Sequence, residues 1–264
     1  MDLGFSDRIA VVTGGSSGID LAAARLLLRE GARVAICGRD EPRLEAARQT
    51  LSSIRGPDHV LARRCDVLNE PEIRDFAGAV ADRSGGTVDL LVNNAGEGRV
   101  STFASTTNED WRRELDLKFF SQILPIRAFK PLLERSASPA VVAVNSLLAY
   151  QPEPHMVCTS AARAGVQSLL KSLAAEFAPA IRVNSVLLGL IDSGQWQRRF
   201  EARTNRDQTR EAWFGELART KGIPLGRLGN PEEPARAILF LGSPAASYIT
   251  GASLEVSGGV SRHI

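Results

Sequence analysis

The sequence predicts an α/β fold in which helices cover both faces of a doubly wound parallel sheet. Short runs rich in β-branched residues alternate with longer amphipathic stretches along the whole chain of 264 residues. Most of the short runs are apolar at every position, which is typical of parallel strands that are buried on both faces. We expect a single domain, 1–264, because no internal repeat or low-complexity linker divides the chain.

The expected strands and helices alternate along the chain. Strands are expected at 8–13, 33–37, 60–64, 89–92, 140–145, 181–187 and 253–256. Amphipathic helices are expected near 17–30, 41–53, 70–83, 108–135, 157–178 and 231–242. With the right-handed crossovers that join parallel strands, this order gives a doubly wound sheet.

The segment 193–222 is longer than the connection expected between a strand and the next helix. It carries seven Arg and Lys residues against four Asp and Glu, and four large aromatic residues, Trp196, Phe200, Trp213 and Phe214. Long insertions in compact domains are usually lids or binding loops. Two interpretations are open: a mobile lid whose aromatic side chains wall a pocket, or two solvated helices with an apolar underside.

The composition excludes several classes of protein. Apolar residues at 44% and charged residues at 23% are ordinary for a globular protein. A net charge of +2 with dispersed arginines does not indicate a protein that binds nucleic acid. No apolar run reaches the roughly 18–20 residues of a membrane span, and we expect neither a membrane anchor nor a signal peptide. The three cysteines, Cys37, Cys65 and Cys158, lack metal-ligand spacing, so we expect reduced thiols, no metal and a cytoplasmic location.

A glycine-rich turn follows the first expected strand and opens the first helix, Thr13-Gly14-Gly15-Ser16-Ser17-Gly18-Ile19-Asp20. Backbone N–H groups in such a turn, together with the positive end of the helix, can bind a pyrophosphate. Further motifs follow in order: Asp66-Val67, Asn93-Asn94-Ala95-Gly96, Ile181-Arg182-Val183-Asn184, Pro224-Leu225-Gly226-Arg227 and Tyr248-Ile249-Thr250-Gly251. Together they resemble the motifs of the short-chain dehydrogenase/reductase family, and the resemblance covers essentially the whole chain.

The resemblance implies a Rossmann-like fold that binds NAD or NADP, and a homodimer or homotetramer built on the helices near 108–135 and 157–178. By the same resemblance, the residues around the cofactor phosphates are Gly14, Ser16, Ser17, Gly18 and Ile19. Those at the adenine are Asp66 and Val67, and those on the nicotinamide side are Asn93, Ala95 and Gly96. The remaining cofactor residues that it implies are Arg163, Gly189, Ile191 and Ser193.

The end of the second strand bears on the choice between NADP(H) and NAD(H). An acidic residue there binds the ribose hydroxyls of NAD and repels the additional phosphate of NADP. This chain has Gly38 in that place, followed by Arg39, whose guanidinium can bind a phosphate in a bidentate manner. We therefore expect NADP(H) to be favoured over NAD(H), although Asp40 lies nearby.

Asp20 departs from the family pattern, which has a glycine at this position. A carboxylate in the first helical turn is favourable to the helix dipole when nothing is bound. The same carboxylate repels a bound pyrophosphate. We therefore expect weakened cofactor binding, unless the side chain turns away.

The catalytic residues of the family are matched only in part. In the family, a Tyr protonates the carbonyl oxygen, a Lys four residues later holds the nicotinamide ribose, a Ser binds the carbonyl, and an Asn on the preceding long helix anchors a water. Ser146 matches the Ser. The other three positions hold Thr159 in place of the Tyr, Arg163 in place of the Lys and Lys118 in place of the Asn.

These exchanges change the available proton chemistry. Thr159 is a poor acid, because an aliphatic hydroxyl is far less acidic than a phenol with a pKa of about 10. Arg163 can bind ribose hydroxyls but stays protonated. Lys118 is either a proton-transferring residue or a surface lysine on a helix face. Three further donors nearby in sequence are expected to be pocket walls: Tyr150, His155 and Cys158.

The sequence thus indicates an NADP(H)-dependent oxidoreductase with a non-standard active site, which transfers hydride to or from a carbonyl, an alcohol or an activated double bond. The basic excess in 193–222 favours an anionic small-molecule substrate. The alternative is a catalytically inactive pseudoenzyme that binds a nucleotide or another ligand. Ser146 and the dinucleotide motifs favour the enzyme, whereas Asp20 and Thr159 favour the pseudoenzyme.

Overall fold

The computed structural model describes residues 2–94, 96, 98–203 and 206–263. Its seven strands form one parallel sheet in the order β3-β2-β1-β4-β5-β6-β7. The strands are β1 (Ile9–Thr13), β2 (Arg33–Gly38), β3 (Val60–Arg64), β4 (Leu90–Asn93), β5 (Ala140–Ser146), β6 (Arg182–Leu188) and β7 (Ser253–Val256). The expected fold class is confirmed, and each strand lies within a residue or so of its expected range.

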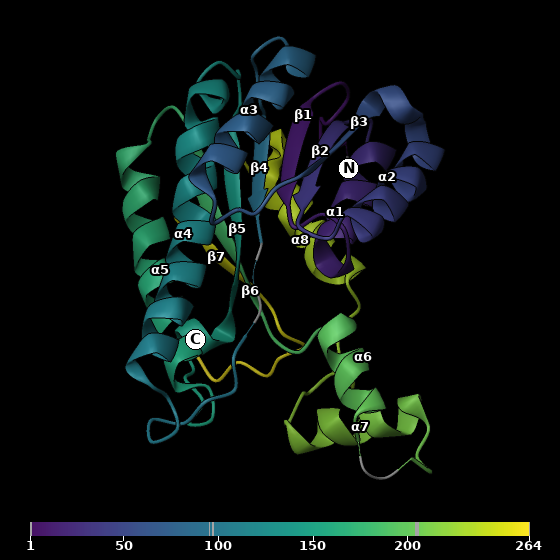
Figure 1. Ribbon diagram of the computed structural model, residues 1–264, viewed down its shortest axis with the longest axis vertical. Helices are drawn as coiled ribbons and strands as arrows, with labels where there is room; N and C mark the ends of the chain where they lie inside the picture. Colours follow the sequence, from purple (N-terminus) through teal and green to yellow (C-terminus); the bar gives the residue numbers. More distant parts are fainter. Residues whose placement is uncertain (1, 95, 97, 204–205, 264) are drawn as a thin grey trace.

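Helices cover both faces of the sheet (Figure 1). One layer contains α1 (Gly18–Arg29), α2 (Glu41–Arg55) and α8 (Glu232–Gly242). The other contains α3 (Glu70–Ser84), α4 (Asn108–Leu133) and α5 (Val157–Glu176). Asp40, Asn69 and Thr107 cap α2, α3 and α4 with side-chain hydrogen bonds, as the residue types preferred at helix starts do.

The alternation of side chains along each strand divides the core between the two faces. In β1, Val12 packs with Leu27 of α1 and Ile238 of α8, among others. Its neighbour Val11 belongs to the opposite core, with Phe76 of α3 and Phe129 of α4. Successive strand residues point to opposite faces, so a strand buried on both faces has to be apolar at every position. This is the pattern that the sequence shows.

The segment 193–222 forms α6 (Gly194–Glu201) and α7 (Arg210–Thr220), which lie apart from the two helix layers in Figure 1. Their apolar sides meet: Phe214 and Ala218 pack with Trp196 and Trp213. The ring centroids of Trp196 and Trp213 lie 6.3 Å apart. The segment is therefore a pair of helices with an apolar underside. That it moves as a lid stays a prediction.

None of the helices in the described part of the chain is long and apolar enough to cross a membrane. The three thiols of Cys37, Cys65 and Cys158 are buried and form no disulfide. No group of three or more His, Cys, Asp or Glu side chains suited to a metal ion occurs among the described residues.

Candidate functional site

The glycine-rich turn leaves the start of α1 with open backbone donors. Gly14 and Gly18 have φ angles of +80° and +59°, which side-chain-bearing residues rarely adopt. Ser17 precedes the helix without capping it through its side chain. The first N–H groups of a helix have no partner within the helix, so those of α1 are available to an anion. Ile19, the second residue of α1, lines the large cavity described below.

Asp20, in the first turn of α1, is turned into the protein. Its side chain is only 7% exposed, and its Oδ1 accepts a 2.7 Å hydrogen bond from Nδ2 of Asn94 at the end of β4. Burial raises the pKa of this carboxyl well above its usual range, and the hydrogen bond from Asn94 opposes that rise only in part. The side chain thus lies buried against Asn94 at the end of β4.

The end of β2 presents Arg39 to solvent. Asp40, which could have competed for a ribose, is instead the cap of α2: its Oδ1 accepts a hydrogen bond from the N–H of Arg43 at 2.9 Å. A Cβ placed on Gly38 would lie 3.4 Å from Oγ of Ser16, so the glycine-rich turn and the end of β2 are neighbours. Gly14, Ser16, Gly38 and Arg39 therefore lie together at the carboxyl ends of β1 and β2.

The ends of β3 and β4 hold the next predicted residues. Asp66 accepts a hydrogen bond from the N–H of Leu68, and Val67 is buried. Asn93 is fully buried at the end of β4 and donates from Nδ2 to the carbonyl oxygen of Gln122 at 3.3 Å. Gly96 has a φ of +138°. Ala95, also predicted here, lies outside the described residues.

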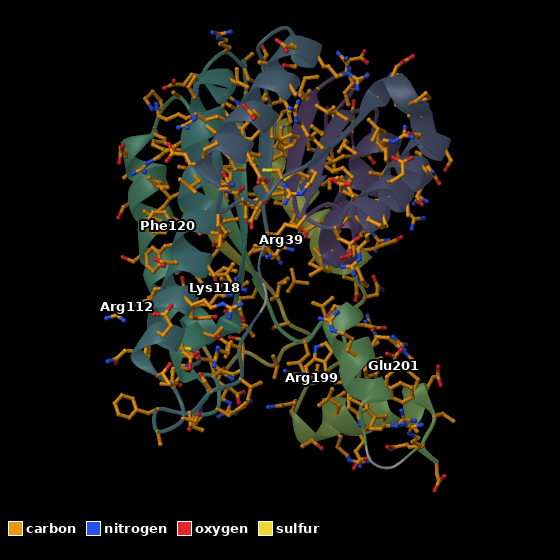
Figure 2. The ribbon with its side chains drawn as sticks, in the orientation of Figure 1. Arg39, Arg112, Lys118, Phe120, Arg199 and Glu201 are labelled. Atoms are coloured by element: carbon orange, nitrogen blue, oxygen red, sulfur yellow. The ribbon has the colours of Figure 1, made fainter. Side chains whose placement is uncertain are left out.

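A cavity of about 470 Å³ opens at the carboxyl ends of β4, β5 and β6, beneath α6. It brings together seven of the predicted site residues: Ile19, Ser146, Thr159, Arg163, Gly189, Ile191 and Ser193. It also has walls that the sequence did not indicate, among them Asn145, Gln151 and Arg262. Trp196, one of the aromatic residues expected to wall a pocket, lines it together with Arg199. Figure 2 places Arg199 on α6, on the side nearer the sheet, with Glu201 on the far side.

At the back of this cavity, Thr159 is held by an acidic residue. Its buried hydroxyl donates to Oε1 of Glu114 at 2.6 Å and accepts from the N–H of Arg99 at 3.1 Å. The same Glu114 oxygen lies 3.4 Å from Nζ of Lys118, one helical turn along α4. Both side chains of this ion pair are about 95% buried, at 4% and 5% exposure. Lys118, labelled in Figure 2, is therefore not a surface lysine.

Arg163 extends from α5 to the end of β5. Its Nη1 donates to the carbonyl oxygen of Val144 at 3.2 Å and to Oδ1 of Asn145 at 3.3 Å. Burial lowers the pKa of Arg163 to about 10, and attraction to Glu114 works against that shift. Its Nε is buried without a hydrogen-bond partner among the described residues. Ser146 caps the short helix Leu147–Ala149 by accepting from the N–H of Leu148 at 3.2 Å.

The three further proton donors that the sequence offered, Tyr150, His155 and Cys158, lie in different environments. His155 lines the cavity, with Nδ1 at 3.3 Å from a carboxylate oxygen of Glu153. Tyr150 is 44% exposed and does not line the cavity. Cys158 is fully buried, with its Sγ 3.2 Å from Oγ of Ser101. The expectation that they wall the pocket therefore fits His155 alone.

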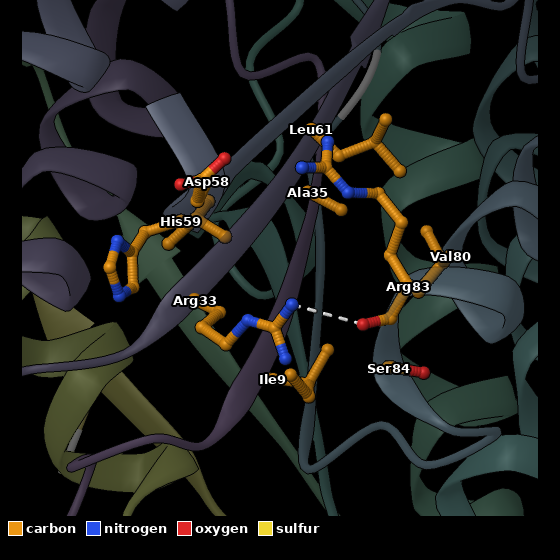
Figure 3. Close-up of a pocket in the computed structure, with 10 residues that line it drawn as sticks. Ile9, Arg33, Ala35, Asp58, His59, Leu61, Val80, Arg83 and Ser84 are labelled. Carbon is orange, nitrogen blue, oxygen red and sulfur yellow. Dashed lines mark hydrogen bonds between the residues drawn. The ribbon is translucent and has the colours of Figure 1, made fainter. Parts of the chain in front are cut away.

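A second, small hollow lies at the opposite edge of the sheet, between the first residues of β1, β2 and β3 and the end of α3 (Figure 3). Its volume is about 30 Å³, which is space for one or two water molecules. Arg33 closes it by donating to the carbonyl oxygen of Arg83 at 3.0 Å. It is too small to hold a substrate.

Glu114 is the main residue that the sequence analysis missed. The one available signal is its position four residues before Lys118, which puts both on the same face of a helix. A Glu and a Lys at this spacing are usually a solvent-exposed pair, so the sequence could not show that these two are buried.

Comparisons with known proteins agree with this geometry. A family model described as enoyl-(acyl carrier protein) reductase matches residues 14–261. The 3-oxoacyl-[acyl-carrier-protein] reductase FabG of Chlamydia trachomatis is 32% identical over 96% of this chain and 97% of its own length. The chain belongs to the short-chain dehydrogenase/reductase family.

Solved structures of related enzymes are similar along the whole chain. One is the structure without ligand of a short-chain oxidoreductase from Pseudomonas aeruginosa PAO1, described as containing an atypical catalytic center. It is 59% identical to this chain, with a TM-score of 0.93, and the match covers 97% of this chain and 98% of that one. Its NADPH-bound structure is 57% identical, with a TM-score of 0.91 over 98% of this chain and 100% of its own. L-Sorbose reductase from Gluconobacter frateurii, solved with NADPH and L-sorbose, is 30% identical, with a TM-score of 0.93 and full coverage of both chains.

We predict that Asp20→Asn stabilises the protein increasingly as the pH rises. The folded state holds the proton of the Asp20 carboxyl more tightly than the unfolded state, where its pKa is about 3.9. Stability contributed by the neutral carboxyl is therefore present at low pH and is lost as the pH rises from about 4 through the raised folded-state pKa. Urea unfolding between pH 4 and 8 should show that the free energy of unfolding of the variant increases relative to that of the wild type over this range.

The control is Asp75→Asn, at an exposed position of α3. Its unfolding free energy should follow the wild type at every pH. A constant difference between Asp20→Asn and the wild type from pH 4 to 8 would contradict the prediction.

Proposed function

We propose that the protein is an NADP(H)-dependent oxidoreductase with a non-standard active site, which transfers hydride between the cofactor and a carbonyl, an alcohol or an activated double bond. The observation that carries the proposal is the cavity, in which Ser146, Thr159 and Arg163 meet at the carboxyl edge of the sheet. Ligands of doubly wound sheets bind at this edge. Family membership and the NADPH-bound relatives support the same conclusion.

The residues present fit a dinucleotide. The open N–H groups at the start of α1, next to Gly14 and Gly18, suit the pyrophosphate. The buried Nε of Arg163, which lacks a partner among the described residues, suits a ribose hydroxyl at the cavity wall. The bound cofactor would supply the hydride. The other proposed cofactor contacts are Ser16, Ser17, Ile19, Asp66, Val67, Asn93, Ala95, Gly96, Gly189, Ile191 and Ser193.

In the proposed reaction, three residues have separate roles. Ser146 orients the reacting oxygen through its hydroxyl at the cavity wall. Arg163 holds the ribose and stays charged throughout. Lys118 supplies the proton, because its ammonium can lose and regain a proton, whereas Thr159 is too weakly acidic. Nζ of Lys118 lies 3.8 Å from where a Cβ on Gly96 would be, next to the expected nicotinamide side.

We predict that Lys118→Ala lowers NADPH-dependent reduction by about 100-fold or more, within the 10²–10⁴-fold that general acid catalysis contributes. Thr159→Val, a variant of the neighbouring hydroxyl, should leave the activity largely intact. The measurement is the initial rate of NADPH oxidation, with NADPH affinity determined separately by calorimetry. Full activity in Lys118→Ala would assign the proton to another donor.

NADP(H) is proposed as the preferred cofactor on the basis of Arg39. Its side chain is exposed at the end of β2, where Gly38 leaves room and no acid takes the family's ribose-binding place. Asp40 is engaged as the cap of α2, which leaves it less suited to bind ribose hydroxyls.

Arg39→Ala is expected to weaken NADPH binding by about tenfold or more and to leave NADH binding unchanged. The reason is the loss of a charge-assisted hydrogen bond to the 2′-phosphate, typically about 1.5–3 kcal/mol. Calorimetric titration of both cofactors measures this, with Arg48→Ala as control, since Arg48 on α2 is paired with Glu45 at 2.7 Å. An equal loss for both cofactors would refute the assignment.

The substrate is proposed to be a small anionic compound. Four cationic residues line the cavity, Arg163, Arg199, Lys221 and Arg262, against one acid, Glu153. Glu153 already faces Lys221 at 3.5 Å and His155 at 3.3 Å. Among the described residues, no acidic side chain forms an ion pair with Arg199 or Arg262, and the Arg199 guanidinium lies 4.6 Å from the ring centroid of Trp196. This leaves positive charge at the cavity mouth for a carboxylate.

We expect the wild type to reduce oxo acids with a lower KM than their methyl esters. Arg199→Ala should raise the KM for the acids by about tenfold, the value of one hydrogen bond to a charged group, and leave that for the esters unchanged. The control is Arg198→Ala, an exposed neighbour on α6 that does not line the cavity. Equal KM values for acid and ester in the wild type would speak against an anionic substrate.

The alternative function is a pseudoenzyme that binds a nucleotide or another ligand. The weak acidity of Thr159 favours this alternative, whereas Asp20, turned into the protein against Asn94, no longer does. NADPH binding without oxidation of NADPH by any carbonyl compound would support it.

We also propose a homodimer or homotetramer that assembles through α4 and α5, in the cytoplasm. Leu115 and Phe120 of α4 are 39% and 41% exposed, and Phe120 projects from the outer side of the helix in Figure 2. Apolar side chains of this size at the surface suit an interface between copies. The three unpaired thiols suit a reducing compartment.

A further inference from the structure

The strongest unexplained feature of the molecule is the buried ion pair between Glu114 and Lys118. Two charges at 4% and 5% exposure have lost nearly all contact with water. Desolvating such a pair is costly, and replacing it with apolar residues of similar volume is often neutral or stabilising. The fold alone therefore gives no reason to retain it.

The pair adjoins the cavity: neither side chain is among the residues that line it, but Glu114 contacts Thr159, which does. On one side, Glu114 accepts the hydrogen bond of Thr159 at 2.6 Å. On the other, Nζ of Lys118 lies 3.8 Å from the Cβ position of Gly96. Glu114 also attracts the guanidinium of Arg163 from α5. One carboxylate thus connects the three side chains that replace the usual catalytic residues.

The surroundings fix Glu114 in this position. Arg99, in the loop after β4, pairs with Asp110 of α4 at 2.8 Å. The backbone N–H of Arg99 then donates to Thr159. Among the described residues, Arg163 of α5 is a charged group from another element that attracts Glu114. Arg99 and Asp110 form an ion pair with each other.

We propose that Glu114 is a positioning residue: its carboxylate holds the Lys118 ammonium in place, so that Lys118 delivers the proton. This inference rests on the proposed oxidoreductase function. In the reductive direction, the bound cofactor would supply a hydride, with its two electrons, to the carbonyl carbon. An N–H bond of Lys118 breaks as the O–H bond of the alcohol forms. The products are the alcohol, the oxidised cofactor and a neutral Lys118, which recovers its proton from water.

The first test is Glu114→Gln, which keeps the size of the side chain and an oxygen for Thr159 but removes the charge. We expect kcat to fall about tenfold or more, a part of the 10²–10⁴-fold of general acid catalysis. The pH above which kcat declines should also move lower, because an ammonium without its counter-charge gives up its proton more easily. NADPH affinity should not change. Glu114→Asp should recover part of the rate.

The matched control is Glu109→Gln, the same exchange on the same helix at an exposed position, with 82% of the side chain accessible. It should keep the wild-type kcat and pH profile. If Glu114→Gln matches this control in both readouts, the inference is overturned.

A double variant separates a structural role from a catalytic one. Glu114→Leu with Lys118→Met replaces the pair with apolar side chains of similar volume, so we expect it to melt at or above the wild-type temperature. It should bind NADPH but oxidise it at least 100-fold more slowly. Wild-type activity in this double variant would overturn the inference.

The proposed function and this inference fail in different ways. If the wild type binds NADPH but turns over no carbonyl substrate, the oxidoreductase proposal fails, and the inference fails with it. If the wild type is active but Glu114→Gln retains its rate and pH profile, only the positioning role of Glu114 fails. Calorimetric titration with NADPH and rate measurement on the same preparations distinguish these outcomes.

Discussion

The parallel direction of the seven strands is the constraint on which the rest of the structure depends. Because every strand runs in the same direction, all the carboxyl ends meet at one edge. The chain must then return over a face of the sheet between neighbouring strands, and helices fill both faces. The glycine-rich turn after β1, the end of β4 and Ser146 at the end of β5 thereby reach one site, although they lie far apart in sequence.

The second general feature is buried charge at that edge. Asp20, Glu114, Lys118 and Arg163 carry ionisable groups in positions from which water is largely excluded. Burying such a group costs free energy unless a neighbouring polar or charged group interacts with it. Asn94 provides this interaction for Asp20, and Glu114 provides it for Lys118. Ionisable groups with a pKa shifted by burial, as for Asp20 and Arg163, are common at functional sites. Their position at the ligand-binding edge connects the energetics of the fold with the proposed chemistry.

The cavity shows how an addition to the common sheet shapes a site. α6 and α7 pack on one another through Trp196, Trp213 and Phe214, and so form a small apolar cluster of their own. This cluster orients Arg199 toward the cavity, while β5 supplies Ser146 and α5 supplies Arg163. The groups proposed for hydride and proton chemistry thus come from the sheet and its helices, and the groups proposed to select a substrate come from the added pair.

The sequence by itself determined the fold class, the ranges of nearly all strands and helices, and the family. It could do so because strands buried on both faces need unbroken apolar runs, and because a turn such as Gly14–Gly18 needs glycines at fixed places. The family resemblance also assigned Thr159, Arg163 and Lys118 to the positions of the family's catalytic residues. It could not decide whether Lys118 was buried, which partner Asp20 had, or that Glu114 joined Thr159 to Lys118. Those facts depend on contacts between α4, α5 and the loop after β4, and the depth at which a helix face is buried follows only from how the elements pack.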